Sequence, residues 1–344
     1  MGTGMGAEQE RPPGLRARLA ALFPGFAVAV LVAVAAEFLS EHYGAPAMLM
    51  ALLLGLALHF LSEQGSRTRE GIEVTSRLLL RIGVALLGAR VSVGMLNDLG
   101  GMMILLVIIG VAATILFGLG VGALFGQDRK LSLLTAGAVA ICGASAAMAI
   151  AAVLPKDSRS ERNLAFTVIA VTLLSTLAMI LYPPLAGLFA FSDLQSGVFL
   201  GGTIHDVAQV VGAGFSISPE TGETATVVKL IRVSLMAPVV LVIALVIRAG
   251  GGEAAQGRRP PLLPGFVLGF LVLAGLNSAG VIPAGLAHLL ETLSRWALLI
   301  AIAAVGIRSS LGRMLDVGGA AVGLVIGESV FLVLVILTGL HLLG

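Results

Sequence analysis

The sequence has few charged residues. Asp, Glu, Lys and Arg make up 12% of its 344 residues, whereas apolar residues make up 58%. Soluble domains are about 25% charged and about 45–50% apolar, and a surface with so few charges cannot be solvated. The composition therefore excludes a soluble globular protein, and the mean hydropathy of +1.04 predicts an all-α, polytopic membrane protein.

Cysteine and catalytic motifs are also scarce. The single cysteine, Cys142, excludes a disulfide framework and a thiolate metal cluster. The formal net charge of +2 is too small to indicate nucleic-acid binding. Because the sequence has no Walker loop, no zinc-spaced histidine cluster and no serine nucleophile elbow, we expect no metal, no cofactor and no enzymatic activity.

Long apolar runs occupy most of the chain after residue 22. A helix of about 20 residues spans the roughly 30 Å bilayer core, so we expect about 9–11 transmembrane segments. Residues 1–22 carry arginines but no apolar core, which is typical of a cytoplasmic tail and not of a signal peptide. Residues 23–344 are expected to form one membrane transport domain, with halves over about 23–182 and about 195–344.

Lysine and arginine are unevenly distributed among the loops. The tail and the loops at 63–77, 126–130 and 249–262 are basic, whereas 40–45, 183–194 and 279–285 have neither residue. Because cytoplasmic loops carry the excess of Lys and Arg, we expect an inner-membrane protein with a cytoplasmic N-terminus and a C-terminus outside.

Two segments disagree with a topology in which every apolar run crosses the membrane once. Residues 155–162 are basic, yet a spanning helix over 131–154 would place them outside. Residues 195–214 show the opposite case, because neither flank has Lys or Arg. We therefore predict two discontinuous helices, either re-entrant from opposite sides or broken while they cross. Irregular backbone at membrane depth is tolerated only where it is buried or lines a cavity, so either form marks a site.

Residues 76–92 and 294–310 match at a constant offset of 218. The coinciding polar and glycine pairs are Ser76/Ser294, Arg77/Arg295, Gly88/Gly306, Arg90/Arg308 and Ser92/Ser310. In the predicted topology the copies run in opposite directions, which indicates an inverted repeat, as in many secondary transporters. Arg77 and Arg295 are expected to snorkel to an interface, and for Arg90 and Arg308 this explanation and a deep intramembrane charge both stay open.

The first discontinuous segment contains small residues and one hydroxyl group around Cys142–Ser145. Glycine permits unwinding, and freed N–H groups at the start of a half-helix can hold an anion. The alternative is tight helix packing. The candidate substrate-binding residues here are Cys142, Gly143, Ala144 and Ser145.

The second segment, Gly201–Gly214, combines four glycines with Thr203, His205, Asp206 and Gln209. On a helix, His205 and Gln209 share one face. An ionised Asp at this depth costs about 2.5–3.5 kcal/mol, so it needs a partner or a proton. These four residues are predicted to bind substrate, with His205 and Asp206 as coupling groups. The alternative is a polar cluster that satisfies itself.

Three further ionisable residues lie deep in apolar runs. Lys229 and Arg232 are structural if acidic groups pair with them, and they bind an anion if they face a cavity; both roles are open. Glu328 is a third candidate coupling group, although we expect it to neutralise an arginine.

These residues together resemble the YeiH-type sulfate exporter family of bacterial inner-membrane proteins. The resemblance rests on the run at 79–90, on Cys142–Ala146, on Gly202–Gly214 and on Lys229–Arg232 followed by Pro238. That family is similar to the cation/proton antiporters and anion transporters, with discontinuous helices in inverted repeats. The resemblance implies a secondary transporter that exports sulfate or a related small anion.

The residues and the resemblance favour a secondary active transporter of small anions. Its partners are the lipid bilayer, a sulfate-like anion and a coupling ion or proton; the choice between monomer and homo-oligomer stays open. A sodium/proton antiporter with Asp206 and Glu328 as ligands is the alternative. An intramembrane enzyme that uses His205 and Asp206 is a third reading, although no nucleophile motif accompanies them.

Overall fold

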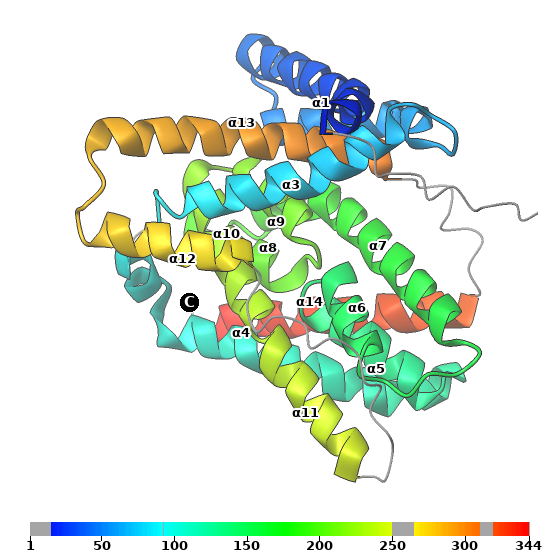
Figure 1. Ribbon diagram of the computed structural model, residues 1–344. Helices are drawn as coiled ribbons and strands as arrows, with labels where there is room; N and C mark the ends of the chain where they lie inside the picture. Colours follow the sequence, from blue (N-terminus) through cyan, green and yellow to red (C-terminus); the bar gives the residue numbers. More distant parts are fainter. Residues whose placement is uncertain (1–14, 92, 250–264, 310–318, 344) are drawn as a thin grey trace, which may run out of the picture.

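The computed structural model describes residues 15–91, 93–249, 265–309 and 319–343, and it contains no strands among them (Figure 1). The described residues are 85% helical. Its helices are α1 (Leu15–Tyr43), α2 (Ala47–Ala57), η1 (His59–Ser62), α3 (Arg69–Leu87), α4 (Val93–Val121), η2 (Gly122–Phe125), α5 (Arg129–Ala140), α6 (Ala144–Ala151), α7 (Ser160–Leu188), α8 (Asp193–Thr203), α9 (Val207–Phe215), α10 (Pro219–Ser234), α11 (Met236–Ala249), α12 (Gly265–Ser278), α13 (Ala284–Arg308) and α14 (Gly319–Leu343).

Six helical stretches of the described residues are long and apolar enough to cross a membrane. They are Leu19–Tyr43, Leu99–Phe125, Ser160–Leu188, Pro219–Ala249, Ala284–Arg308 and Gly319–Leu343. The prediction of a polytopic, all-α membrane protein is confirmed. Six is fewer than the expected 9–11, because the apolar runs at 131–154 and 195–214 are each divided into two short helices and because α2 and α12 have only 11 and 14 residues.

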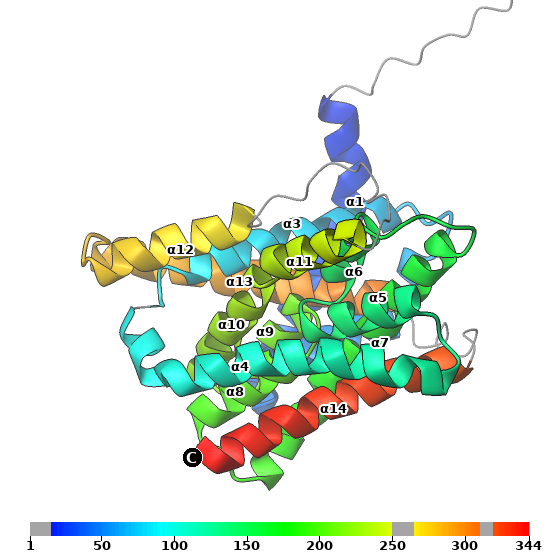
Figure 2. The same cartoon turned by 90° about the horizontal axis from the view of Figure 1, so that it is seen from below.

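The helices form two layers. Helices α1, α2, α3, α12 and α13 lie together in the first layer, and α4 to α10 with α14 make up the second (Figures 1 and 2). Glycine allows close packing within the first layer, since a Cβ atom on Gly55 would lie 2.5 Å from the Ala303 carbonyl oxygen and one on Gly306 would lie 2.5 Å from that of Leu52. Small residues let helix backbones approach in this way.

Most of the two matching sequence segments lies on α3 and α13, which pack antiparallel, and the matched pair Ser92 and Ser310 lies outside the described residues. Ser294 donates to the Gly83 carbonyl at 2.7 Å, and Arg308 donates to the Ser76 hydroxyl at 3.3 Å. Numbers therefore rise along one helix as they fall along the other. This is the relative direction that an inverted repeat requires, although the repeat itself stays a prediction.

Helices α5 and α6 form a hairpin whose two ends lie side by side. Asp128 caps α5 by accepting from the Leu131 N–H at 2.8 Å. At the next position, the Lys130 ammonium donates to Pro155 O at 3.0 Å and to an Asp157 oxygen at 2.8 Å, just beyond α6. The Lys130 ammonium lowers the pKa of Asp157 to about 2.

Helices α8 and α9 form a second hairpin with the same property. The Asp193 carboxylate, at the start of α8, accepts hydrogen bonds of 2.7 Å from Ser218 and from Thr221 beyond α9. Helix α7 connects the open end of the first hairpin to that of the second. Its 29 residues span about 43 Å, so the hairpins enter the second layer from opposite ends of α7.

Candidate functional site

The tips of the two hairpins meet in the interior of the second layer. Residues 141–143 separate α5 from α6, and Gly143 has φ +65° and ψ −125°, a conformation that L side chains rarely adopt. Residues 204–206 separate α8 from α9. His205 Nδ1 lies 3.2 Å from the Val139 carbonyl oxygen, so the tips are in contact. We call residues 139–143 and 201–206 together the crossing.

The expected helix face shared by His205 and Gln209 is wrong. Ile204 and Asp206 both have extended backbone, so the chain is not helical between Thr203 and Val207. Because the helix stops before His205, spacing by four residues no longer sets the relative direction of the two side chains. Asp206 instead caps α9, accepting from the Ala208 N–H at 2.9 Å.

Lys229 and Arg232 of α10 join the two tips. The Lys229 ammonium donates to Ile141 O at 2.8 Å and to Ile204 O at 3.0 Å. The Arg232 guanidinium donates to four carbonyl oxygens: Nη2 to Val139 at 2.7 Å, Nε to Ala140 at 2.9 Å, and Nη1 to Ile204 at 3.0 Å and Gly201 at 3.1 Å. Both side chains are fully buried.

These contacts give the two cations a role that neither sequence alternative contained. The last carbonyls of a helix have no intrahelical donor and carry partial negative charge. Lys229 and Arg232 supply donors and positive charge to the ends of α5 and α8 at once. No acidic side chain of the described residues lies within ion-pair distance of either cation.

His205 is fully enclosed at the crossing. The Val139 carbonyl can only accept, so its contact with His205 requires a proton on Nδ1. Ser329 of α14 lies 2.9 Å from Nε2, and its hydroxyl also lies 2.8 Å from the Val325 carbonyl oxygen, so its one proton is shared between two possible acceptors. His205 therefore links the first hairpin to α14.

The remaining predicted residues differ in exposure. Asp206 is half-buried at the crossing, and Gln209 is buried with its Nε2 3.4 Å from the Thr176 hydroxyl. The Gln209 Oε1 is buried and, within the part of the chain that the structure describes, has no hydrogen-bond partner. The Thr203 hydroxyl donates to Phe199 O at 2.6 Å. Cys142 and Gly143 are buried at the first tip, Ala144 is half-buried, and Ser145 is exposed on α6.

Glu328 lies 0% exposed on α14, beside α5. Its Oε1 accepts from the Thr135 hydroxyl at 2.9 Å, and its Oε2 has no partner among the described residues. No described arginine lies within ion-pair distance. The structure thus pairs Glu328 with a hydroxyl, and the expected neutralisation of an arginine is not seen across the described ranges.

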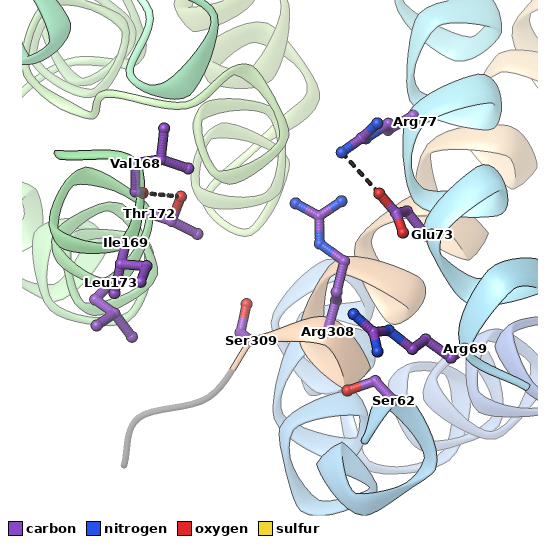
Figure 3. Close-up of a pocket in the computed structure, with 10 residues that line it drawn as sticks. All are labelled: Ser62, Arg69, Glu73, Arg77, Val168, Ile169, Thr172, Leu173, Arg308 and Ser309. Carbon is purple, nitrogen blue, oxygen red and sulfur yellow. Dashed lines mark hydrogen bonds and ion pairs between the residues drawn. The ribbon is translucent and has the colours of Figure 1, made fainter. Parts of the chain in front are cut away.

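A cavity of about 280 Å³ lies between the two layers (Figure 3). One wall comes from the first layer and the other from α7. The lining residues are Ser62, Arg69, Glu73, Arg77, Arg308 and Ser309 on the first wall, and Val168, Ile169, Thr172 and Leu173 on the second. Arg77 pairs with Glu73 at 2.8 Å. Three guanidinium groups against one carboxylate make the cavity positive.

The cavity is electrostatically linked to the crossing. Arg308 and Asp206 lie close enough to attract each other, and Asp206 has the same relation to the buried Lys229. Two hydroxyl residues of α7 also connect the cavity with the crossing. Thr172 lines the cavity, and Ser175 accepts from the His205 and Asp206 N–H groups at 3.2 and 3.0 Å. Asp206 is therefore within electrostatic range of both the buried Lys229 and Arg308 of the cavity.

The sequence did not predict this cavity, because snorkelling to an interface was an open explanation for Arg308 and Arg90. Arg90 forms ion pairs with Glu223 of α10 and, at 2.8 Å, with Glu291 of α13. Arg295 pairs with Glu37 of α1. The matched positions Arg90 and Arg308 were the signal available, since both helices carry an arginine at the layer boundary.

Comparisons with known proteins identify the chain's relatives. The family model described as conserved hypothetical protein 698 matches residues 24–324. A UPF0324 membrane protein named TauZ from Paracoccus pantotrophus is 66% identical over 323 residues, 94% of this chain and 96% of that protein. A UPF0324 membrane protein of Rhizobium meliloti (strain 1021) is 59% identical over 337 residues, which cover 98% of this chain and 97% of that protein. A UPF0324 membrane protein of Chlorobaculum tepidum is 50% identical over 315 residues, which cover 92% of this chain and 88% of that protein. The chain therefore belongs to the UPF0324 family of membrane proteins, with which the resemblance to the YeiH-type family agrees.

Proposed function

We propose that this protein is a secondary active transporter of small anions, with sulfate or a related oxyanion or sulfonate as substrate. The observation that carries the proposal is the basic cavity between the two helix layers, which is linked to the half-buried Asp206 at the crossing. Fixed positive charge concentrates anions, and irregular backbone at membrane depth is tolerated where it is buried or lines a cavity.

The residues divide into two groups in this proposal. Lys229 and Arg232 hold the hairpin tips together, because their donors are engaged by backbone carbonyls. Asp206 and Gln209 are the side chains that respond to substrate or to the coupling ion: Asp206 is half-buried beside the cavity, and Gln209 has an unpartnered buried oxygen among the described residues.

Two further observations support an anion. Two relatives from Paracoccus bear the name TauZ, which hints at a taurine- or sulfonate-related role for those proteins. The basic loop predicted at 63–77, with Arg67 and Arg69, adjoins the cavity and is cytoplasmic by the positive-inside rule. We infer an inner-membrane protein whose cavity opens to the cytoplasm and whose two hairpins are re-entrant.

Transport assays with purified protein in liposomes test this function. Vesicles that contain the wild type should take up labelled sulfate or a short sulfonate when a proton or ion gradient is imposed, and empty vesicles should not. Asp206→Asn should abolish the gradient-driven component, because the amide oxygen still caps α9 but cannot ionise. Asp157→Asn, a carboxylate in the exposed loop, is the matched control and should transport normally.

The same vesicles distinguish the anion transporter from the alternative, a sodium/proton antiporter. Proton movement on addition of sodium, without any transported anion, would favour that alternative. The positions nearest the meeting tips are occupied by Lys229 and Arg232, and Glu328 is bonded to Thr135. A cation would meet strong repulsion there, which is why we place the anion first. Wild-type rates in Asp206→Asn would remove Asp206 from the mechanism.

A further inference from the structure

The cavity between the layers has two chemically unlike walls (Figure 3). The first-layer wall carries the guanidinium groups, and the α7 wall carries Val168, Ile169 and Leu173. We propose that this cavity binds an organic oxyanion, with its acidic head between Arg69 and Arg308 and a short hydrocarbon part along α7. The inference rests on the proposed anion transport and narrows its substrate class.

The guanidinium groups are the donors that remain for a bound anion. The hydroxyl groups in the lining donate to backbone carbonyls: Ser62 to His59 O and Ile307 O at 2.9 Å, Thr172 to Val168 O at 2.7 Å, and Ser309 to Val305 O at 2.8 Å. Each hydroxyl has only one proton to donate. An oxyanion in the cavity therefore depends on arginine.

Two of the three arginines are available for this purpose. Glu73 neutralises Arg77 at 2.8 Å. Neither Arg69 nor Arg308 has a carboxylate within ion-pair distance in the described ranges, and Arg308 has only the 3.3 Å bond to the Ser76 hydroxyl. In Figure 3 the Arg308 guanidinium points toward the Glu73–Arg77 pair, and the Arg69 guanidinium lies near the base of the Arg308 side chain on the same wall. Two planar forks on one wall suit the oxygens of a sulfonate, sulfate or carboxylate.

The size and the second wall favour more than a bare inorganic ion. A water needs a cavity of only about 10–15 Å³, and the volume here is about 280 Å³. A single tetrahedral oxyanion held by Arg69 and Arg308 would leave most of that space, and the apolar side chains of α7, in contact with water. A hydrocarbon part fills the space and covers those side chains.

Chain length provides the quantitative test. Full burial of one methylene group changes affinity by about fourfold, and a cavity with one apolar wall should give about two- to fourfold per methylene. We expect purified wild type in a non-ionic detergent to bind ethane-, butane- and hexanesulfonate with dissociation constants that fall by this factor. Sulfate should bind more weakly than butanesulfonate. Calorimetric titration measures each constant directly.

Variants separate the two walls. Arg308→Gln and Arg69→Gln should each weaken all the sulfonates about tenfold or more and leave the dependence on chain length unchanged. Val168→Thr combined with Ile169→Thr keeps the branching at Cβ, and it should flatten that dependence while ethanesulfonate binds as before. Arg67→Gln, an exposed loop arginine outside the cavity, is the control and should bind like the wild type.

The outcomes distinguish this inference from the proposed function. Equal affinities for sulfate and hexanesulfonate would overturn the inference, and so would a chain-length dependence that the α7 variant does not change or wild-type binding by Arg308→Gln. In each case the anion transport assay could still succeed with sulfate. Conversely, chain-length-dependent binding without any transport in vesicles would support the cavity and refute the transport function.

Discussion

The strongest structural prediction concerns Arg232. Its guanidinium is fully buried and is the one side chain that bonds carbonyls of both α5 and α8 through all three of its nitrogens, among the described residues. Arg232→Ala would leave the Ala140 and Gly201 carbonyl oxygens without these donors and would open a cavity at the crossing, whereas Val139 O keeps His205 Nδ1 and Ile204 O keeps Lys229. We expect the two hairpin tips to separate.

The structure sets the size of this effect. A buried acceptor left without a partner costs about 1–3 kcal/mol. Two such carbonyls give about 2–6 kcal/mol, which is a large part of the roughly 5–15 kcal/mol that stabilises a typical domain. At about 2 °C per kcal/mol for a chain of this length, the apparent melting temperature should fall by at least about 4 °C. Arg232→Lys should fall less, because it keeps the charge and one or two bonds.

Scanning fluorimetry of the detergent-purified protein measures this change through Trp296, the single tryptophan. Arg248→Ala, an exposed arginine at the end of α11, is the matched control and should melt within about 1 °C of the wild type. Normal melting of Arg232→Ala together with lost anion binding would refute the reasoning, because the guanidinium would then act on substrate and not on the framework.

Three further results are expected. Gly143→Ala forces an L side chain into φ +65° and should cost about 1–3 kcal/mol, whereas Gly187→Ala, with open space around a helical position, should be neutral or stabilising in the same melting assay. Glu328→Gln should fold, since an amide oxygen also accepts from Thr135, but its transport in vesicles should lose any proton coupling that Glu328 carries. The depressed pKa of Asp157 means that its ion pair with Lys130 stabilises the hairpin above about pH 4 and is lost as pH falls towards 2; melting curves from pH 6 to pH 3 should therefore drop more in the wild type than in Asp157→Asn.

Composition and local patterns predicted the class of fold. The scarcity of charge and the apolar runs indicated an all-α membrane protein, and the glycines near 143 and 201–202 indicated where helical geometry ends. These features are local: a glycine tolerates positive φ whatever its neighbours are. The basic loop at 155–162 also indicated a discontinuous segment through a local feature. Its residues Lys156 and Asp157 lie next to the end of α6.

The contacts of the site could not be predicted in the same way. The carbonyl partners of Lys229 are 88 and 25 residues away, and the partner of His205 on α14 is 124 residues away. The cavity needs α3, α7 and the end of α13 to lie together, which no spacing within one helix indicates. His205 and Gln209 do not share a helix face, because the helix is interrupted at 204–206. The backbone at Asp206 is extended, and a new helix starts after it.

The buried cations and the cavity cations of this protein have different roles, one in stability and one in binding. Lys229 and Arg232 lie at 0% exposure, and their partners are the fixed partial charges at two helix ends, so moving either of them would break several hydrogen bonds at once. Arg308 has one long hydrogen bond and is exposed to the cavity, so a ligand can take the place of water on it at little structural cost. Loss of stability with retained binding should therefore follow changes at the crossing, and loss of binding with retained stability should follow changes in the cavity. Because Asp206 is within electrostatic range of Lys229 and of Arg308, it is the position at which a bound anion and the hairpin framework can affect each other.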